Sequence, residues 1–148
     1  MKKLSIENAI NSGDWYEYKD GDRIFRFRII SFRKVQLSEI ENIDRIDSSL
    51  PINDGILLLI SIELINLSKN RSSGYGLYLS ILDEEDFKFN DLDCNYLTKN
   101  SGFARRNNLR SVDYIPKFKY KRGLIFLVPN ENSKYYLTTT YDAIITKI

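Results

Sequence analysis

The strongest concentration of chemically active side chains lies in a basic segment at residues 99–122. Eight Lys or Arg residues occur there against one acid, and four aromatic residues are interleaved with them. Ammonium and guanidinium groups neutralise phosphates or carboxylates, while flat rings stack on nucleic-acid bases. The candidate partner contacts in this segment are Phe103, Arg105, Arg106, Arg110, Tyr114, Lys117, Lys119, Lys121 and Arg122.

Three interpretations of this segment are open. Lys117, Lys119 and Lys121 alternate with Phe118 and Tyr120, which is the pattern of a strand with an aromatic inner face and a solvated basic outer face. The second interpretation is contact with nucleic acid, although the segment holds no recognisable nucleic-acid-binding motif. The third is contact with an acidic protein partner. The alternation favours the solvated strand face, and the pattern does not choose between the two partners.

A second charged feature has the opposite sign and lies earlier in the chain. Between Gln36 and Asn95 there are twelve Asp or Glu residues and four Lys or Arg residues. The densest group, residues 83–86, is followed by Asp91 and Asp93, and carboxylate oxygens are ligands that Ca²⁺ prefers. The spacing and central glycine of a helix-loop-helix calcium site are missing. We therefore predict a solvated hairpin turn at residues 83–86.

The sequence holds no set of residues that is typical of an enzyme. Histidine is absent, which removes the usual general base near neutral pH and, with it, the common zinc sites and Ser-His or Cys-His pairs. No Gly-rich phosphate loop occurs. Cys94 is the single cysteine, so no intrachain disulfide can form. We expect its side chain to act as a small, buried hydrophobic group. We expect a non-catalytic protein with no metal and no cofactor.

The elements that must position these residues are mostly strands. Ile, Leu, Tyr and Phe dominate the apolar residues, and branched or aromatic side chains favour strands. Near the N-terminus, residues 4–12 are expected to form a short lead-in helix that is capped by Ser5 and ended by Gly13. The alternating patterns that follow predict strands at residues 15–18 and 23–35. In the second of these, apolar residues share one face while Arg26 and Arg28 point to the other, which predicts a half-buried strand.

The apolar patterns after residue 55 predict the remaining strands. Ile56 to Asn66 is the strongest, and its nearly continuous apolar start is typical of a central strand that is covered on both sides. The other predicted strands are residues 76–82, 87–89, 117–121, 124–128 and 135–146. The pair around Gly123 is expected to form a hairpin. The connections 36–55 and 90–115 are expected to be irregular, with a helical turn around residues 38–43.

Seven or eight strands separated by turns favour two packed antiparallel sheets, because each strand must bury one face. We therefore predict an all-β, immunoglobulin-like antiparallel sandwich at residues 15–148, preceded by a lead-in segment at residues 1–14. A closed barrel is the alternative. The 148 residues fit a single domain. The longest apolar run, residues 56–60, is too short to cross a bilayer.

Four segments in a fixed order also carry a family resemblance. They are an amphipathic strand at residues 25–29, a central strand and turn at 54–68, a strand, acidic turn and strand at 79–87, and a late strand at 122–129 that ends in Val-Pro. On these segments the chain resembles the immunoglobulin-like domains of bacterial secreted proteins and lipoproteins, the group that includes immunoprotective extracellular antigens. The resemblance implies a sandwich fold and an interaction role, with no catalytic residues.

These features predict a non-catalytic binding module that recognises a protein partner through its loops and strand faces. The alternative is a small nucleic-acid-binding accessory protein of a bacterium or phage that uses residues 99–122. Two sheets leave edge strands, so a homodimer through an edge strand is a further option. We expect a cytoplasmic location if the chain is complete as given, and an extracytoplasmic one if it is a mature fragment of an exported protein.

Overall fold

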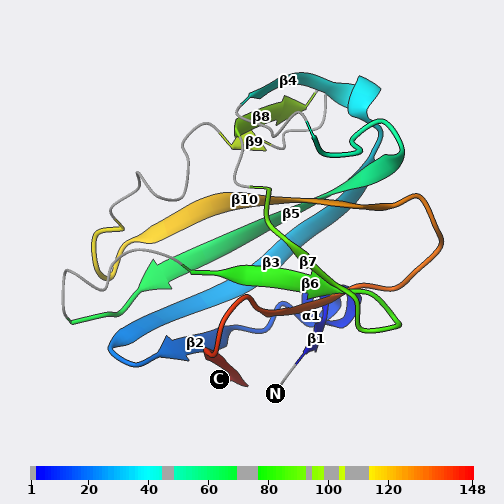
Figure 1. The fold of residues 1–148 in the computed structure, drawn as a ribbon. Coiled ribbons are helices and arrows are strands. Elements are labelled where there is room, and N and C mark those ends of the chain that lie inside the picture. Colours follow the sequence, from blue (N-terminus) through cyan, green and yellow to red (C-terminus); the bar gives the residue numbers. More distant parts are fainter. Residues whose placement is uncertain (1–2, 45–48, 70–76, 93–94, 99–103, 106–113) are drawn as a thin grey trace.

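The computed structural model of the chain is an all-β fold with a short α-helix (Figure 1). It describes residues 3–44, 49–69, 77–92, 95–98, 104–105 and 114–148. Two antiparallel sheets share one core, and a smaller third sheet packs on the opposite face of the first. The predicted antiparallel all-β sandwich with a short N-terminal helix is confirmed.

The first sheet contains the longest strands and has the order β10-β5-β3-β2-β12, with every pair antiparallel. Its strands are β2 (Tyr16–Asp20), β3 (Arg23–Val35), β5 (Gly55–Asn66), β10 (Lys119–Pro129) and β12 (Ile144–Lys147). The bounds of β3 are those predicted from the sequence, and β5 starts one residue earlier than predicted.

The second sheet has four short strands in the order β1-β11-β6-β7. Its strands are β1 (Leu4–Ser5), β6 (Leu79–Leu82), β7 (Lys88–Asn90) and β11 (Tyr136–Thr139). In Figure 1 these strands cross in front of the long diagonal strands of the first sheet. The sequence pattern suggested one strand over residues 135–146. That prediction is wrong, because the turn at residues 140–143 separates β11 from β12 and sends them to different sheets.

The third sheet has the order β4-β8-β9 and lies at the top of Figure 1. It contains β4 (Ile40–Asp44), β8 (Asn95–Thr98) and β9 (Ala104–Arg105), and a 3₁₀ turn, η1 (Leu37–Glu39), precedes β4. The expectation of irregular connections at residues 36–55 and 90–115 is therefore wrong for these strands. β4 pairs with β8 across a long sequence separation, which local pattern does not reveal, and β9 then pairs with β8.

The main core lies between the first and second sheets and follows from the alternation of the strands. Along β3, Phe25, Phe27 and Ile29 face inward and are almost completely buried. Their partners from the second sheet include Ile81 and Leu137, each with 0% exposure. The inward face of the predicted half-buried strand is thus confirmed.

β5 is buried on both faces of the first sheet over much of its length, as is the middle of its neighbour β10. Leu58 and Ile60 belong to the main core, while Leu57 and Leu59 belong to a second core with Ile125. Ile40 and the half-buried Ile43, both in the third sheet, cover this second core. This arrangement confirms the prediction that the apolar start of β5 is covered on both sides.

The helix α1 (Ile6–Ser12) closes one edge of the main core. The Ser5 Oγ accepts a hydrogen bond from the backbone N–H of Asn8 at 3.3 Å, which satisfies one of the free donors of the first turn. Gly13 ends the helix in the left-handed region, at φ +67°, and donates its N–H to the Ala9 carbonyl at 3.0 Å. Both the predicted cap and the predicted stop are confirmed.

We expect Gly13→Ala to destabilise the fold by about 1 kcal/mol, because an L side chain is strained at this positive φ. A Cβ at this position would meet no atom within 4 Å, so backbone strain is the only cost. Gly13→Asn is the matched control, since Asn tolerates the left-handed region. Urea denaturation of both variants measures the effect, and equal stability of Gly13→Ala and the wild-type chain would contradict the cap assignment.

β10 departs most clearly from the sequence-based expectation. The predicted hairpin around Gly123 is wrong: residues 119–129 form one continuous strand that pairs with β5 from end to end. Gly123 lies opposite Ser61 in the middle of this ladder, so the glycine is accommodated because the twelve-residue partner strand supplies an uninterrupted template. Phe118, predicted to point inward, precedes the strand and is 63% exposed.

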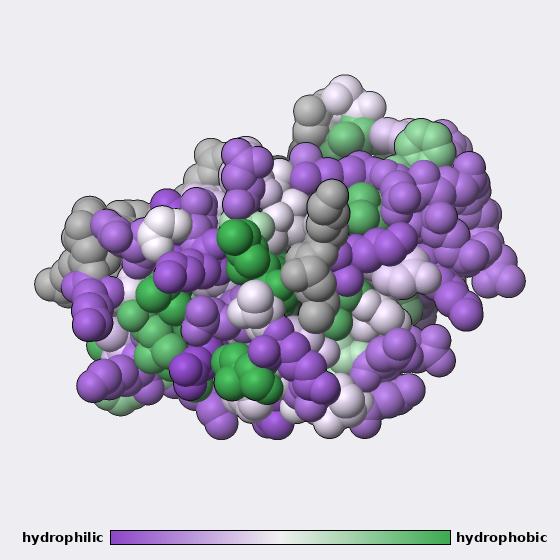
Figure 2. Space-filling model, turned by 90° about the horizontal axis from the view of Figure 1, so that it is seen from below, coloured by the Kyte–Doolittle hydropathy of each residue, from purple (hydrophilic) through white to green (hydrophobic). Residues whose placement is uncertain are grey.

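The side of the molecule that carries both termini shows hydrophobic residues as separate islands among hydrophilic ones (Figure 2). Across the described residues, the large hydrophobic side chains that are more than half exposed are Phe87, Ile115, Phe118, Tyr141, Ile144 and Ile148. Within the same residues, no helix is long and apolar enough to span a membrane.

Candidate functional site

The outer face of β5, which points away from the second sheet, changes character along the strand. Its first half presents Leu57 and Leu59, which the third sheet covers. Its second half presents Ser61, Glu63 and Ile65 in the same alternation. The candidate site lies around this second half, where the sheet face carries polar and charged side chains.

Glu63 lies at the centre of the site, between one cation on each neighbouring strand. Its register partners are Arg28 on β3 and Lys121 on β10. Both pairs place unlike charges directly opposite each other, an arrangement that stabilises antiparallel strands.

Ile65 lies two residues further along β5 and again has one cation opposite it on each neighbouring strand. Its register partners are Arg26 on β3 and Lys119 on β10, both of which are exposed. Trp15, which directly precedes β2, lies beside Arg28 and Lys119. We call the set formed by these side chains the basic face, and its members are Trp15, Arg26, Arg28, Glu63, Lys119 and Lys121.

Glu63 orders two of the cations. Its Oε1 accepts a hydrogen bond from Arg28 Nη2 at 2.8 Å, and its Oε2 lies 3.5 Å from Lys119 Nζ. The Glu63 side chain is only 10% exposed, whereas those of Arg28 and Lys119 are 37% and 55% exposed. The Arg28 hydrogen bond, helped by the positive charge of Lys119 and opposed by burial, lowers the pKa of Glu63 below its ordinary value.

The Trp15 ring contacts the same two cations, Arg28 and Lys119. The Arg28 guanidinium carbon lies 5.3 Å from the centroid of the indole, and Lys119 Nζ lies 5.6 Å from it. Both distances are within the range of a cation–π interaction. Arg28 and Lys119 are therefore fixed between a carboxylate and an aromatic ring, which reduces the entropy that they would lose on binding a partner.

The chemistry that this arrangement supports is the binding of anions. Four cations surround Glu63, and Glu17 on β2 is the one further carboxylate opposite them in register; within the described residues Arg26 and Lys121 form no ion pair. The basic face holds no nucleophile beside a general base, and within the described residues no group of three potential metal ligands occurs.

Two of the predicted contact residues, Lys119 and Lys121, lie on the basic face. Lys117 is also exposed, but it lies in the turn before β10 at φ +71° and donates its backbone N–H to the Asn66 carbonyl. The solvated basic face predicted for this strand is present from Lys119 onward.

Arg122 and Tyr114 lie in the interior, so they are not surface contacts. Arg122 is 6% exposed, because its register partner is Ile62 and it therefore points toward the main core. Its Nη1 donates a hydrogen bond to the Tyr114 hydroxyl. Tyr114 is 3% exposed and packs edge-on against Phe25 and Tyr120. This pair orders the start of β10.

The remaining predicted contacts cannot be placed on this surface. Phe103, Arg106 and Arg110 lie outside the described residues, as does Cys94, and Arg105 is described only through its backbone in β9. The acidic turn is described: Asp83 Oδ1 accepts hydrogen bonds from the N–H groups of Glu85 and Phe87, both at 2.9 Å. This local network accounts for the buried Asp83 carboxylate as a turn-forming group.

Sequence reasoning missed the part of the site that comes from β2, β3 and β5. The alternation of β3 did place Arg26 and Arg28 on its polar face, and that was the available signal. Their proximity to Lys119 depends on the pairing of β5 with both β3 and β10, which no local pattern encodes. The alternation of β5 likewise placed Glu63 on the face opposite its core residues, but nothing in the sequence linked Glu63 or Trp15 to these cations.

The comparisons with known proteins give no relative from which a function could be transferred. No protein-family model, no curated protein and no solved structure matches the chain.

Proposed function

We propose that the chain is a non-catalytic, immunoglobulin-like binding module that recognises an acidic segment of a protein partner through the basic face. The observation that carries this proposal is the cluster of four cations on β3 and β10 around the single buried carboxylate of Glu63. Charge complementarity of this kind steers encounter and selects partners. The two packed antiparallel sheets support the immunoglobulin-like class.

The positions of the acids favour a protein segment over nucleic acid. Glu63 lies in the middle of the basic face, and Glu17 is the register partner of Arg26 on β2. A continuous phosphate backbone would meet both carboxylates, whereas an acidic peptide can place its side chains beside the cations and avoid them. Base stacking also lacks a platform, because Arg28 and Lys119 already contact the one indole.

The test compares two anionic probes, a fluorescent oligoglutamate peptide and a single-stranded oligonucleotide of similar charge, by polarisation at increasing salt. We expect the peptide to bind more tightly than the oligonucleotide. The double variant Arg26→Gln/Lys121→Gln should bind the peptide about tenfold more weakly, because two exposed charges contribute about 1–2 kcal/mol together. Neither side chain forms an ion pair within the described residues, so the fold should be little affected.

The matched control is Lys34→Gln/Lys134→Gln, which removes two exposed cations that lie away from the basic face. This variant should bind the peptide like the wild-type chain. Equal weakening by both double variants would show that only net charge matters. Tighter binding of the oligonucleotide, lost in Arg26→Gln/Lys121→Gln, would replace the protein partner by nucleic acid.

A further inference from the structure

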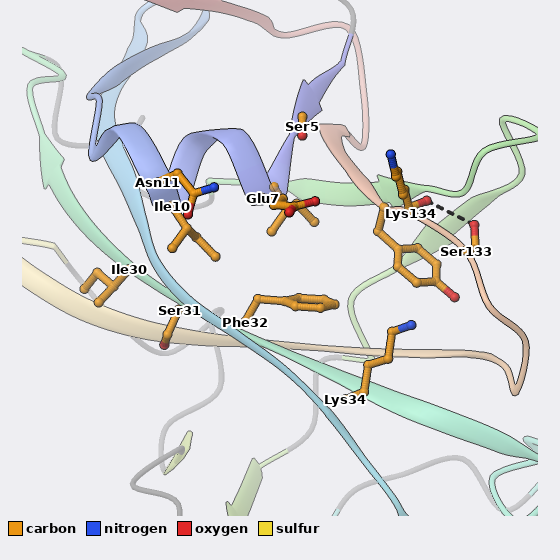
Figure 3. A pocket seen from close by; sticks show the side chains of 12 residues that line it. Ser5, Glu7, Ile10, Asn11, Ile30, Ser31, Phe32, Lys34, Ser133 and Lys134 are labelled. Carbon is orange, nitrogen blue, oxygen red and sulfur yellow. Dashed lines mark hydrogen bonds between the residues drawn. The ribbon is translucent and has the colours of Figure 1, made fainter.

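A second site lies on the inner side of β3, opposite the basic face. It is a pocket of about 420 Å³ between α1, the second half of β3 and the segment that leads into β11 (Figure 3). The residues that line it are Ser5, Ile6, Glu7, Ile10, Asn11, Ile30, Ser31, Phe32, Lys34, Ser133, Lys134 and Tyr135. Its volume is within the usual range for sites that bind small molecules.

The pocket exists because β3 is irregular where α1 crosses it. The register of β3 against β5 shifts between Ile29 and Ser31, so Ile30 is an extra residue that has no partner on β5. A bulge of this kind bends a strand and redirects its side chains. In Figure 3, Ile10 of α1 points toward the strand that carries Ile30 and Phe32. Together these three side chains give the pocket an apolar floor.

Tyr135 supplies a polar group that the protein leaves unused. The residue is 6% exposed, and its hydroxyl is buried with no hydrogen-bond partner among the described residues. Burial, followed by the negative charges of Glu131 and Asp83, raises the pKa of Tyr135, so the hydroxyl is a protonated donor at neutral pH. A buried donor without an acceptor destabilises a protein, and an acceptor on a ligand would relieve that cost.

Lys34 places a positive charge over the ring of Tyr135. Its Nζ lies 5.4 Å from the centroid of the Tyr135 ring, and Phe32 lies on the same ring at a centroid distance of 6.5 Å. Among the charged residues that line the pocket, Lys34 and Lys134 oppose the single acid Glu7. Glu84, which does not line the pocket, accepts a hydrogen bond from the backbone N–H of Lys134 at 2.8 Å. The lining residues alone carry one net positive charge, which favours a ligand with a single negative charge over a more highly charged one, because Glu84, Glu131 and Asp83 lie close by.

We propose that this pocket binds an organic acid with an apolar body. The body lies on Ile10, Ile30 and Phe32, and the carboxylate accepts a hydrogen bond from the Tyr135 hydroxyl and pairs with Lys34. This site is independent of the basic face, because Arg26 and Arg28 lie on the opposite side of β3. Failure of either proposal leaves the other standing.

The test titrates decanoate into the ¹⁵N-labelled chain and follows backbone amide shifts by NMR, with decanol as the uncharged comparison. We expect saturable shifts at α1, at residues 30–34 and at residues 133–135. Decanol should bind about tenfold more weakly. Lys34→Gln and Tyr135→Phe should each weaken decanoate binding about tenfold, while Arg26→Gln/Lys121→Gln should leave it unchanged.

Thermal melts of both variants keep the result interpretable. Tyr135→Phe removes a hydroxyl that has no partner, so the variant should be at least as stable as the wild-type chain, and a loss of binding cannot then be attributed to unfolding. The proposal is overturned if decanoate produces no saturable shifts, if the shifts map to the basic face, if decanol binds equally well, or if neither single substitution weakens binding.

Discussion

Leu59→Ala is expected to destabilise the protein by about 2–5 kcal/mol, as much as the same change at Leu58. The two leucines are adjacent on β5, both have 0% exposure, and they belong to different cores on opposite faces of the first sheet. A loss of this size is a large part of the total stability of a domain. Urea denaturation, read as the shift of the midpoint, measures it.

Ile65→Ala is the control for Leu59→Ala. Ile65 lies on the same outer face of β5, but it is half-buried and does not belong to the second core. The Ile65→Ala variant should therefore lose clearly less stability than the Leu59→Ala variant. If Leu59→Ala were as mild as Ile65→Ala, the third sheet would not be a packed cover of the first, and the division of the outer face into a covered half and a basic half would fail.

Glu63→Gln is expected to destabilise the fold by about 2 kcal/mol, because it removes a nearly buried carboxylate that carries a charge-assisted hydrogen bond and a second ion pair. The amide keeps the shape of the side chain, so the loss reports the charge. Calorimetry at neutral pH measures the change. Glu17→Gln is the control, since Glu17 lies opposite Arg26 of the same face but forms no ion pair within the described residues.

The pH dependence of stability gives an independent test of Glu63. Its pKa is lowered in the folded state, so the folded protein binds this proton less readily than the unfolded chain. The stabilisation is therefore present above the pKa of the unfolded chain, about 4.3, and is lost as the pH falls through the lower folded value. We expect Glu63→Gln to lose stability less steeply than the wild-type chain below pH 4.3. Identical slopes would contradict the Arg28–Glu63 pairing.

The elements that the sequence predicted well are those whose local signals agree with their tertiary environment. β3 alternates strictly over residues 25–29, β5 combines branched apolar residues with a buried position, and α1 has both its cap and its stop in the sequence. In each case propensity, patterning and burial favour the same structure. Their bounds could therefore be predicted to within a residue or two.

The elements that were missed depend on distant partners. β4 pairs with β8 through residues about fifty positions apart, and neither segment alternates clearly enough to be recognised alone. The sequence predicted a break in β10 at Gly123, because glycine usually weakens a strand. In the structure β10 stays paired with β5 on both sides of this glycine. Arg122 was assigned to the surface because of its charge, whereas its place in that ladder turns it inward.

The most direct test of the basic face uses the single tryptophan of the chain as a local reporter. Trp15 contacts Arg28 and Lys119, so an acidic peptide that binds there must change the environment of the indole. We predict a saturable change in Trp15 emission during titration with oligoglutamate, with the same midpoint as the polarisation curve. Binding by polarisation while Trp15 emission stays constant would place the partner elsewhere and contradict the proposed function.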